Sequence, residues 1–271
     1  MVIKEGKKFL IAEVGINHGG NLSKAFKLVD DAKKSGADAI KFQTYQTEKR
    51  VKKNSPIFKI LKKSELSFED FKRIKVYCEK KNILFFSTPF DKESVKFLNK
   101  LKVKLFKIAS FDISNYDLIN EILKTKKPTI VSTGMASLNE IKKIINLFKK
   151  KRVHIYVLHC LSSYPAKENE MYLKNIIYLN KKFKVPIGIS DHTNDIKTSI
   201  VSYSLGARIF EKHFTLKNDR KCVDYPVSID KTKFMKMKNE MENIERMLGK
   251  VKFGIRRNEK NAKQFKRKKI I

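Results

Sequence analysis

Short apolar runs alternate along the chain with longer segments in which apolar residues recur every three or four positions. The short runs are typical of buried parallel strands, and the longer segments are typical of helices with one apolar face. Strands are predicted at residues 9–16, 38–43, 83–87, 105–109, 129–132, 154–159, 186–190 and 207–210. Helices are predicted at residues 22–35, 67–80, 92–101, 117–124, 138–150, 171–182, 195–205 and 231–248, and a longer basic loop is predicted between residues 43 and 67.

This alternation predicts the fold class. Eight strand–helix units in about 250 residues are typical of an α/β protein with a (β/α)₈ TIM barrel. A doubly wound open sheet is the alternative. Two helix ends carry their own signals, since Ser67 and Asp70 form an approximate capping box and Gly249 follows the last helix. In a barrel, the residues at the carboxyl ends of the strands form the active site.

The length and composition favour one large domain. The chain has 271 residues, and no apolar run approaches the length of a membrane span. We expect a catalytic barrel at residues 1–249 and a basic tail at residues 250–271. The three cysteines are odd in number and far apart, which predicts a reducing compartment and therefore a cytoplasmic protein.

The charge of the chain is strongly positive. Lys and Arg number 61 against 28 Asp and Glu, a formal net charge of +33. Lysine dominates the excess and is spread over presumed helix surfaces, and the chain has no Trp. A solvated lysine-rich surface is therefore expected rather than a nucleic-acid groove. The tail concentrates the charge, because residues 250–269 hold ten basic side chains and one acidic side chain.

Two predicted strands end in similar polar clusters. Residues 190–192 read Ser-Asp-His, and residues 211–213 read Glu-Lys-His. In a barrel these neighbouring strand ends would bring His192 and His213 to one mouth, with Asp191 and Glu211 beside them. Such nitrogen and oxygen donors are plausible ligands of a divalent metal. The alternative is that each histidine is a hydrogen-bonded structural residue.

Lys41 and Lys107 each follow apolar residues at the end of a predicted strand. A buried lysine is costly unless its charge is paired. Together with nearby Ser and Thr hydroxyls, the two lysines predict a clamp for a phosphate or carboxylate. The alternative is an internal ion pair with Glu13 or Asp112.

Two further motifs are weak indications of function. Gly19 and Gly20 lack the spacing of a dinucleotide or P-loop motif and predict a tight turn. His159 and Cys160 are adjacent on one strand, so their side chains should point to opposite faces. A nucleophilic Cys–His pair formed by these two residues is therefore not expected.

Eight short blocks together resemble the sialic acid synthase family, which also contains the pseudaminic and legionaminic acid synthases. The resemblance covers about residues 8–250, and every block falls at a predicted strand end. In chain order the blocks are IAEVGINHGG, AIKFQTY, FFSTPFD, FKIASFDISN, VSTGM, LHCLSSYP, GISDHT and FEKHFT.

The resemblance implies condensation of phosphoenolpyruvate with an open-chain N-acetylated amino sugar, giving a nine-carbon 2-keto acid and phosphate. It implies a divalent cofactor, Mn²⁺ or Mg²⁺, with His192 and His213 as ligands. It implies a phosphoenolpyruvate clamp made of Lys41, Thr88, Lys107, Ser110, Ser132 and Ser190. The positions similar to the family's sugar-binding set are Gln43, Asp112, Ser162, Tyr164 and Asp224.

Two carboxylates match family positions near the reacting centre, Glu13 and Glu211. We expect Glu13 to orient or deprotonate the water that adds to the former enol carbon. Glu211 and Asp112 remain alternatives for this catalytic role.

The sequence departs from the family pattern at several positions. Asp112 stands where many sialic acid synthases have Glu, and Ser162 occupies an Asn position. Cys222-Val223-Asp224 replaces a common Gly-Pro-Asp. The KIAS block is more similar to the pseudaminic and legionaminic branch, so the identity of the sugar stays open.

Family members usually continue into a small antifreeze-like domain, whose arginine reaches the partner's site in a swapped dimer. This sequence stops at Ile271, where that domain would begin. A homodimer and a separate antifreeze-like domain are therefore both open as partners. The alternative function is an inactive barrel that serves as a binding or assembly subunit.

Overall fold

The computed structural model describes residues 2–4 and 6–267, which contain eight strands and ten α-helices. The strands are β1 (Phe9–Gly15), β2 (Ala39–Thr44), β3 (Leu84–Pro89), β4 (Phe106–Ile108), β5 (Thr129–Ser132), β6 (Ile155–Cys160), β7 (Ile187–Asp191) and β8 (Ile209–His213). The helices are α1 (Leu22–Lys34), α2 (Thr47–Arg50), α3 (Phe58–Ser64), α4 (Phe68–Lys80), α5 (Lys92–Lys100), α6 (Tyr116–Lys124), α7 (Leu138–Lys150), α8 (Lys174–Phe183), α9 (Lys197–Ser204) and α10 (Lys231–Leu248).

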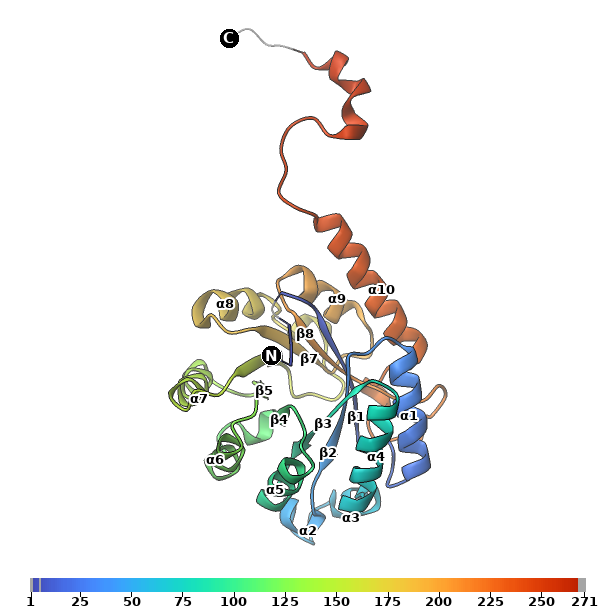
Figure 1. The fold of residues 1–271 in the computed structure, drawn as a ribbon, viewed down its shortest axis with the longest axis vertical. Coiled ribbons are helices and arrows are strands. Elements are labelled where there is room, and N and C mark those ends of the chain that lie inside the picture. Colours follow the sequence, from blue (N-terminus) through green and yellow to red (C-terminus); the bar gives the residue numbers. More distant parts are fainter. Residues whose placement is uncertain (1, 5, 268–271) are drawn as a thin grey trace.

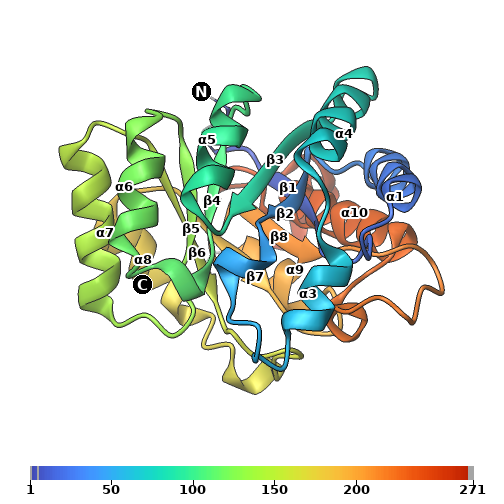
Figure 2. The same cartoon turned by 90° about the horizontal axis from the view of Figure 1, so that it is seen from below.

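The eight strands form a closed parallel barrel in sequence order. Each strand pairs with the next, and β1 closes the ring by pairing with β8. The helices surround the strands (Figure 1), and the view from below shows the same arrangement (Figure 2). The predicted (β/α)₈ barrel is confirmed. The doubly wound alternative is wrong, because an open sheet would leave two unpaired edge strands.

Side chains alternate between the inside and the outside of the barrel, as the pleat of a strand requires. Ile11, Leu105 and Ile209 belong to the apolar cluster that fills the interior, while Leu10 and Ala12 belong to the larger cluster beneath the helices. The apolar residues of the strands fill these two clusters, and the inward positions at the carboxyl end of the barrel are left for other chemistry.

One layer of inward-facing side chains at the carboxyl end is almost entirely polar. Each member lies two positions after an inward residue of the layer below, so the pleat brings one side chain from every strand to the same level. All eight members are buried and line one cavity. They are Glu13, Lys41, Thr88, Lys107, Ser132, Cys160, Ser190 and Glu211.

Local signals account for several element boundaries. Ser67 and Asp70 form a full capping box at the start of α4, and Gly249 caps the end of α10, so both predictions are confirmed. The stretch between β2 and α4, predicted as a loop, contains two short helices, α2 and α3, which the sequence analysis missed. Neither helix has a side-chain cap at its first turn, since Gln46 and Ile57 occupy the N-cap positions.

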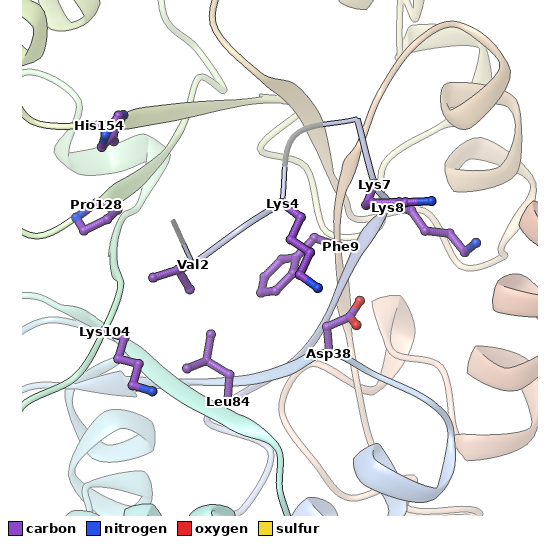
Figure 3. Close-up of a pocket in the computed structure, with 10 residues that line it drawn as sticks. All are labelled: Val2, Lys4, Lys7, Lys8, Phe9, Asp38, Leu84, Lys104, Pro128 and His154. Carbon is purple, nitrogen blue, oxygen red and sulfur yellow. The ribbon is translucent and has the colours of Figure 1, made fainter.

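A separate cavity lies at the amino ends of the strands, on the opposite side of the barrel from the polar layer. Its walls include Phe9 at the start of β1 and Leu84 at the start of β3, and Figure 3 shows Val2 and Lys4 beside them. It has about 930 Å³ of space and shares no lining residue with the cavity at the carboxyl ends.

Beyond α10, the chain runs away from the barrel as an exposed extension (Figure 1). Two short 3₁₀ turns, Arg257–Glu259 and Asn261–Phe265, occur in it. The last four residues of the predicted tail, 268–271, lie outside the described residues. Within the described chain, no helix has both the length and the apolar character needed to cross a bilayer.

Candidate active site

Two lysines and two glutamates form the centre of the polar layer. Lys41 Nζ lies 2.8 Å from Glu13 Oε2 and 3.6 Å from Glu211 Oε2, and Lys107 Nζ lies 3.1 Å from Glu211 Oε1. All four side chains are buried. The alternative ion pair predicted for Lys41 with Glu13 is therefore present. Lys107 pairs with Glu211 from the opposite wall rather than with Asp112.

Neighbouring hydroxyls complete this centre. Lys41 Nζ donates to Thr88 Oγ1 at 3.0 Å, and Ser190 Oγ donates to Glu211 Oε1 at 2.9 Å. These contacts join β2, β3, β7 and β8 through side chains alone. The ion pairs and hydroxyl contacts compensate part of the cost of burying four charges.

The environment separates the pKa values of the two carboxyl groups. Burial raises the pKa of Glu13, and the charge of Glu211 adds to this effect, although Lys41 acts against it. Burial would also raise the pKa of Glu211, but Lys107 and Lys41 outweigh it and lower that pKa to about 2. Glu211 is therefore held as a carboxylate, whereas Glu13 is the better carrier of a proton.

The ends of β4, β5 and β6 bring small hydroxyl groups together. Gly134 N donates to Ser110 Oγ at 3.0 Å, and a Cβ at Gly134 would collide with Ser162 Oγ. Only glycine therefore allows this close approach. Ser132 Oγ is buried and has no hydrogen-bond partner within the described chain. This wall of the cavity thus offers an unused donor beside Lys107.

His192 and His213 face the same mouth, as predicted. Their ring centroids lie 5.4 Å apart, and the ring of Tyr164 stacks on His192 at 4.1 Å. His192 Nδ1 lies 2.8 Å from the carbonyl oxygen of Leu161, so this nitrogen carries the proton and donates. Nε2 then accepts from Tyr164 Oη at 3.1 Å.

The histidine pair fits a divalent metal only in part. A backbone carbonyl fixes the tautomer of His192 and leaves Nε2 with its lone pair toward the mouth, as in many metal-ligating histidines. His213 Nδ1 is buried without a hydrogen-bond partner in the described chain and lies 3.4 Å from Asp224 Oδ2. No group of three His, Cys, Asp or Glu side chains in residues 2–4 and 6–267 forms a ready site. Two imidazoles thus face the mouth, and their role as metal ligands stays a prediction.

Three predicted residues gather around Gly15, whose φ is +55°. A Cβ there would lie 3.3 Å from Asp224 Oδ2, Gln43 Nε2 and Glu13 Oε1. Gln43 and Asp224 thus lie beside Glu13, and Gln43 is one layer nearer the solvent than Lys41.

Asp191 does not join the metal site, so that expectation was wrong. Its Oδ1 lies 3.2 Å from Lys212 Nζ, and its oxygens accept from Thr193 and Ser199 behind the barrel wall. The pleat explains the error, because Asp191 is the neighbour of inward-facing Ser190 and must point outward. His159 points outward for the same reason, and its Nε2 lies 2.6 Å from the carbonyl oxygen of Met171.

Asp112 lies at the rim rather than in the centre. It ends a 3₁₀ turn (Ser110–Asp112) and accepts from Asn115 Nδ2 at 2.9 Å. It is not among the residues that line the cavity. Its catalytic role stays a prediction, and the geometry favours Glu13 and Glu211.

Sequence reasoning missed Arg50, Phe90 and Phe111. Phe90 and Phe111 line the cavity, and the guanidinium of Arg50 lies over the ring of Phe90. Arg50 stands among many lysines in a stretch read as a basic loop, so its position carried no signal. The two phenylalanines follow polar strand ends, where an aromatic residue alone does not indicate a site.

Comparison with known proteins places the chain in a family. The family model described as the NeuB family matches residues 28–253. An uncharacterized protein of Methanocaldococcus jannaschii, MJ1065, is 44% identical over 89% of this chain and 72% of its own. The N,N'-diacetyllegionaminic acid synthase of Campylobacter jejuni is 38% identical over 90% of this chain and 78% of its own.

A solved structure shows the same architecture. The N-acetylneuraminic acid (sialic acid) synthetase of Leptospira borgpetersenii superposes with a TM-score of 0.91 at 36% sequence identity, over 96% of this chain and 91% of that one. The likeness in structure thus extends over nearly the whole of this chain. The chain belongs to the NeuB family.

Proposed function

We propose that this chain is an enzyme that condenses phosphoenolpyruvate with an open-chain N-acetylated amino sugar. The products would be a nine-carbon 2-keto acid and inorganic phosphate. The observation that carries the proposal is the buried cluster of Lys41, Lys107, Glu13 and Glu211 beside two histidines at one barrel mouth. The synthase relatives named above support the reaction class.

Phosphoenolpyruvate would occupy the wall from β2 to β7. Lys41 and Lys107 would bind its phosphate and carboxylate, and hydroxyls would add donors of fixed position. The remaining members of this clamp are Thr88, Ser110, Ser132 and Ser190. The space between these side chains is only about 50 Å³, so binding would require the lysines to turn from their glutamates toward the substrate.

The net charge of the two lysines and two glutamates affects how strongly phosphoenolpyruvate would bind. Two ammonium groups face two carboxylates there, so the cluster has little net positive charge to attract an anion. A proton on Glu13 would remove one negative charge, consistent with its raised pKa. A divalent cation, Mn²⁺ or Mg²⁺, on His192 and His213 would supply further positive charge and Lewis acidity toward a carbonyl oxygen.

The residues suit the bond changes of this reaction. The methylene carbon C3 of phosphoenolpyruvate attacks the aldehyde carbon of the sugar, and positive charge develops on C2, the carbon that bears the phosphate oxygen. Ionised Glu211 would stabilise that charge. Protonated Glu13 would give its proton to the alkoxide oxygen of the sugar and would then, as a carboxylate, accept a proton from the water that adds at C2. The resulting hemiketal phosphate then loses inorganic phosphate. Gln43, Ser162, Tyr164 and Asp224 would position the sugar.

Phosphate release tests the proposal. Wild-type protein is incubated with phosphoenolpyruvate, Mn²⁺ and each of several N-acetylated hexoses, with each substrate omitted in turn. Phosphate should appear only when both substrates are present, and Glu13→Gln should lose most of the rate. No sugar-dependent phosphate from a folded wild type across the panel would favour the alternative, an inactive barrel that acts as a binding or assembly subunit.

We also propose a cytoplasmic location. Cys78, Cys160 and Cys222 are all buried free thiols, which is compatible with a reducing compartment.

A further inference from the structure

Arg50 is the last residue of α2, the short helix that follows β2. Two acidic side chains tie this helix to its surroundings. Thr47 donates from its backbone N and from Oγ1 to Glu65 Oε2, at 3.1 and 2.6 Å. On the other side, Gln46 N donates to Asp91 Oδ2 at 3.0 Å. The backbone of Arg50 is therefore held in place rather than carried on a loose loop.

The guanidinium of Arg50 is fixed at the edge of the active-site cavity. Its Cζ lies 3.6 Å from the ring centroid of Phe90 and 4.7 Å from that of Tyr45. Its Nη1 donates to Gln43 Oε1 at 3.0 Å. Gln43 and Phe90 both line the cavity. Stacking on an aromatic ring sets the plane of the guanidinium and leaves the N–H groups at its edge free to donate.

Most of these donors are unused. A guanidinium has five N–H donors, and within the described chain this one makes a single hydrogen bond, to Gln43. It forms no ion pair with a carboxylate in that part of the chain. It still acts electrostatically on Asp112 at the end of β4 and on Asp224 after β8. Arg50 thus stands between the two sides of the mouth with donors to spare.

We propose that Arg50 binds the amino sugar, donating from its free guanidinium N–H groups to hydroxyl or acetamido oxygen atoms. This inference rests on the proposed function. A guanidinium is a donor only, so it selects acceptor oxygens and takes no part in proton transfer. Its partner Gln43 lies two residues beyond Lys41 on β2, one layer above the phosphoenolpyruvate clamp. Arg50 therefore meets the sugar and not the phosphate.

The test compares Arg50→Met with Arg50→Lys and with Lys49→Met. Lys49 belongs to the same helix, but it is exposed and pairs with Glu93 at 3.1 Å, away from the cavity. Arg50→Met should raise the sugar KM about tenfold to hundredfold, the effect expected for a lost charge-assisted hydrogen bond. Arg50→Lys should raise it less, and Lys49→Met should leave it unchanged. The affinity for phosphoenolpyruvate, measured by calorimetry, should change less than threefold in all three.

A double variant separates direct binding from support of Gln43. If Arg50 contacts the sugar, Gln43→Ala with Arg50→Met should raise the sugar KM beyond the effect of Gln43→Ala alone. Any one of three results would overturn this inference while leaving the proposed function intact. The sugar KM could be unchanged in Arg50→Met, or it could be the same in the double variant as in Gln43→Ala. Arg50→Met could also lose as much affinity for phosphoenolpyruvate as for the sugar. A folded wild type without any sugar-dependent turnover would overturn the proposed function and this inference with it.

Discussion

Lys107 and Glu211 come from opposite walls of the barrel, and each neutralises part of the other's charge in a buried centre. At the scale of single residues, the main feature of the proposed site is that the substrate would replace a protein carboxylate as the partner of a buried lysine. An anionic substrate would take over the role that Glu211 plays for Lys107. The same lysine then serves the stability of the free barrel and the binding of the substrate.

Replacing Lys107 with Met should weaken the binding of phosphoenolpyruvate by about 1.5–3 kcal/mol, because one charge-assisted contact is lost. It should also raise the pKa of Glu211, which Lys107 helps to hold at about 2. Titration calorimetry measures the first effect. Lys104→Met, at the opposite end of the barrel, is the matched control and should bind as wild type does. An unchanged affinity in Lys107→Met would remove Lys107 from the clamp.

His18 provides a prediction about stability and pH. Burial lowers its pKa to about 4 from a usual value of 6.5, and Lys24 adds to the effect. The unfolded chain therefore binds more protons than the folded chain between these values, so the free energy of unfolding falls as pH decreases from 6.5 to about 4. The loss should reach about 3 kcal/mol.

Urea unfolding between pH 4 and pH 7 measures this contribution. His18→Asn keeps an acceptor for Gly20 N, which now donates to His18 Nδ1 at 3.1 Å, but it cannot titrate. The variant should therefore have a shallower pH dependence than wild type. Parallel curves for wild type and His18→Asn would show that His18 does not titrate as described.

Much of the site could be predicted at this scale, and the two errors have different causes. Lys41 and Lys107 were identifiable because a charge inside an apolar run needs a partner or a ligand, whereas the family resemblance indicated Glu13 and Glu211. Asp191 was misplaced, because one residue along a strand reverses the direction of a side chain. Which glutamate pairs with Lys107 depends on the closure of the ring, which no local pattern contains.

At the scale of elements, helix capping explains why α4 could be predicted from the sequence and why α2 and α3 were missed. The helix α4 begins with a capping box in which Ser67 Oγ accepts from Asp70 N at 3.0 Å and Asp70 Oδ2 accepts from Ser67 N at 3.2 Å. That signal is visible in the sequence. The helices α2 and α3 have no such cap, and tertiary contacts such as those of Glu65 hold α2, so sequence reasoning took them for a loop.

Removing the cap should cost stability without affecting the site. Ser67→Ala should lower the free energy of unfolding by about 1 kcal/mol, whereas Ser67→Gly should lower it by only a few tenths. Chemical denaturation measures both, and the affinity for phosphoenolpyruvate should stay as in wild type. Equal stability of Ser67→Ala and wild type would mean that the box contributes nothing to the start of α4.

At the scale of the whole molecule, the barrel and the extension after α10 are different in kind. The strands close into one packed ring, while every described residue from 250 to 267 is exposed, including Val251 and Phe253. The barrel could be predicted because the eightfold alternation repeats over the whole chain. The two possible partners, a second copy in a homodimer and a separate antifreeze-like domain, stay predictions.

Deleting residues 250–271 should leave the barrel intact. The described part of this segment packs against nothing buried, so Tm should stay within about 2 °C of the full chain, less than a loss of 1 kcal/mol would produce. Differential scanning calorimetry measures this, with phosphoenolpyruvate affinity as the second readout. A drop of Tm by more than about 5 °C would show that the extension stabilises the barrel.

The most direct test of the central claim follows the carbon skeleton. The full chain is incubated with Mn²⁺, an N-acetylated hexose and phosphoenolpyruvate that carries ¹³C at C2, and the products are examined by mass spectrometry and NMR. The account predicts a nine-carbon 2-keto acid that retains the label at its keto carbon, formed with one equivalent of phosphate. Release of labelled pyruvate without any product joined to the sugar would contradict it.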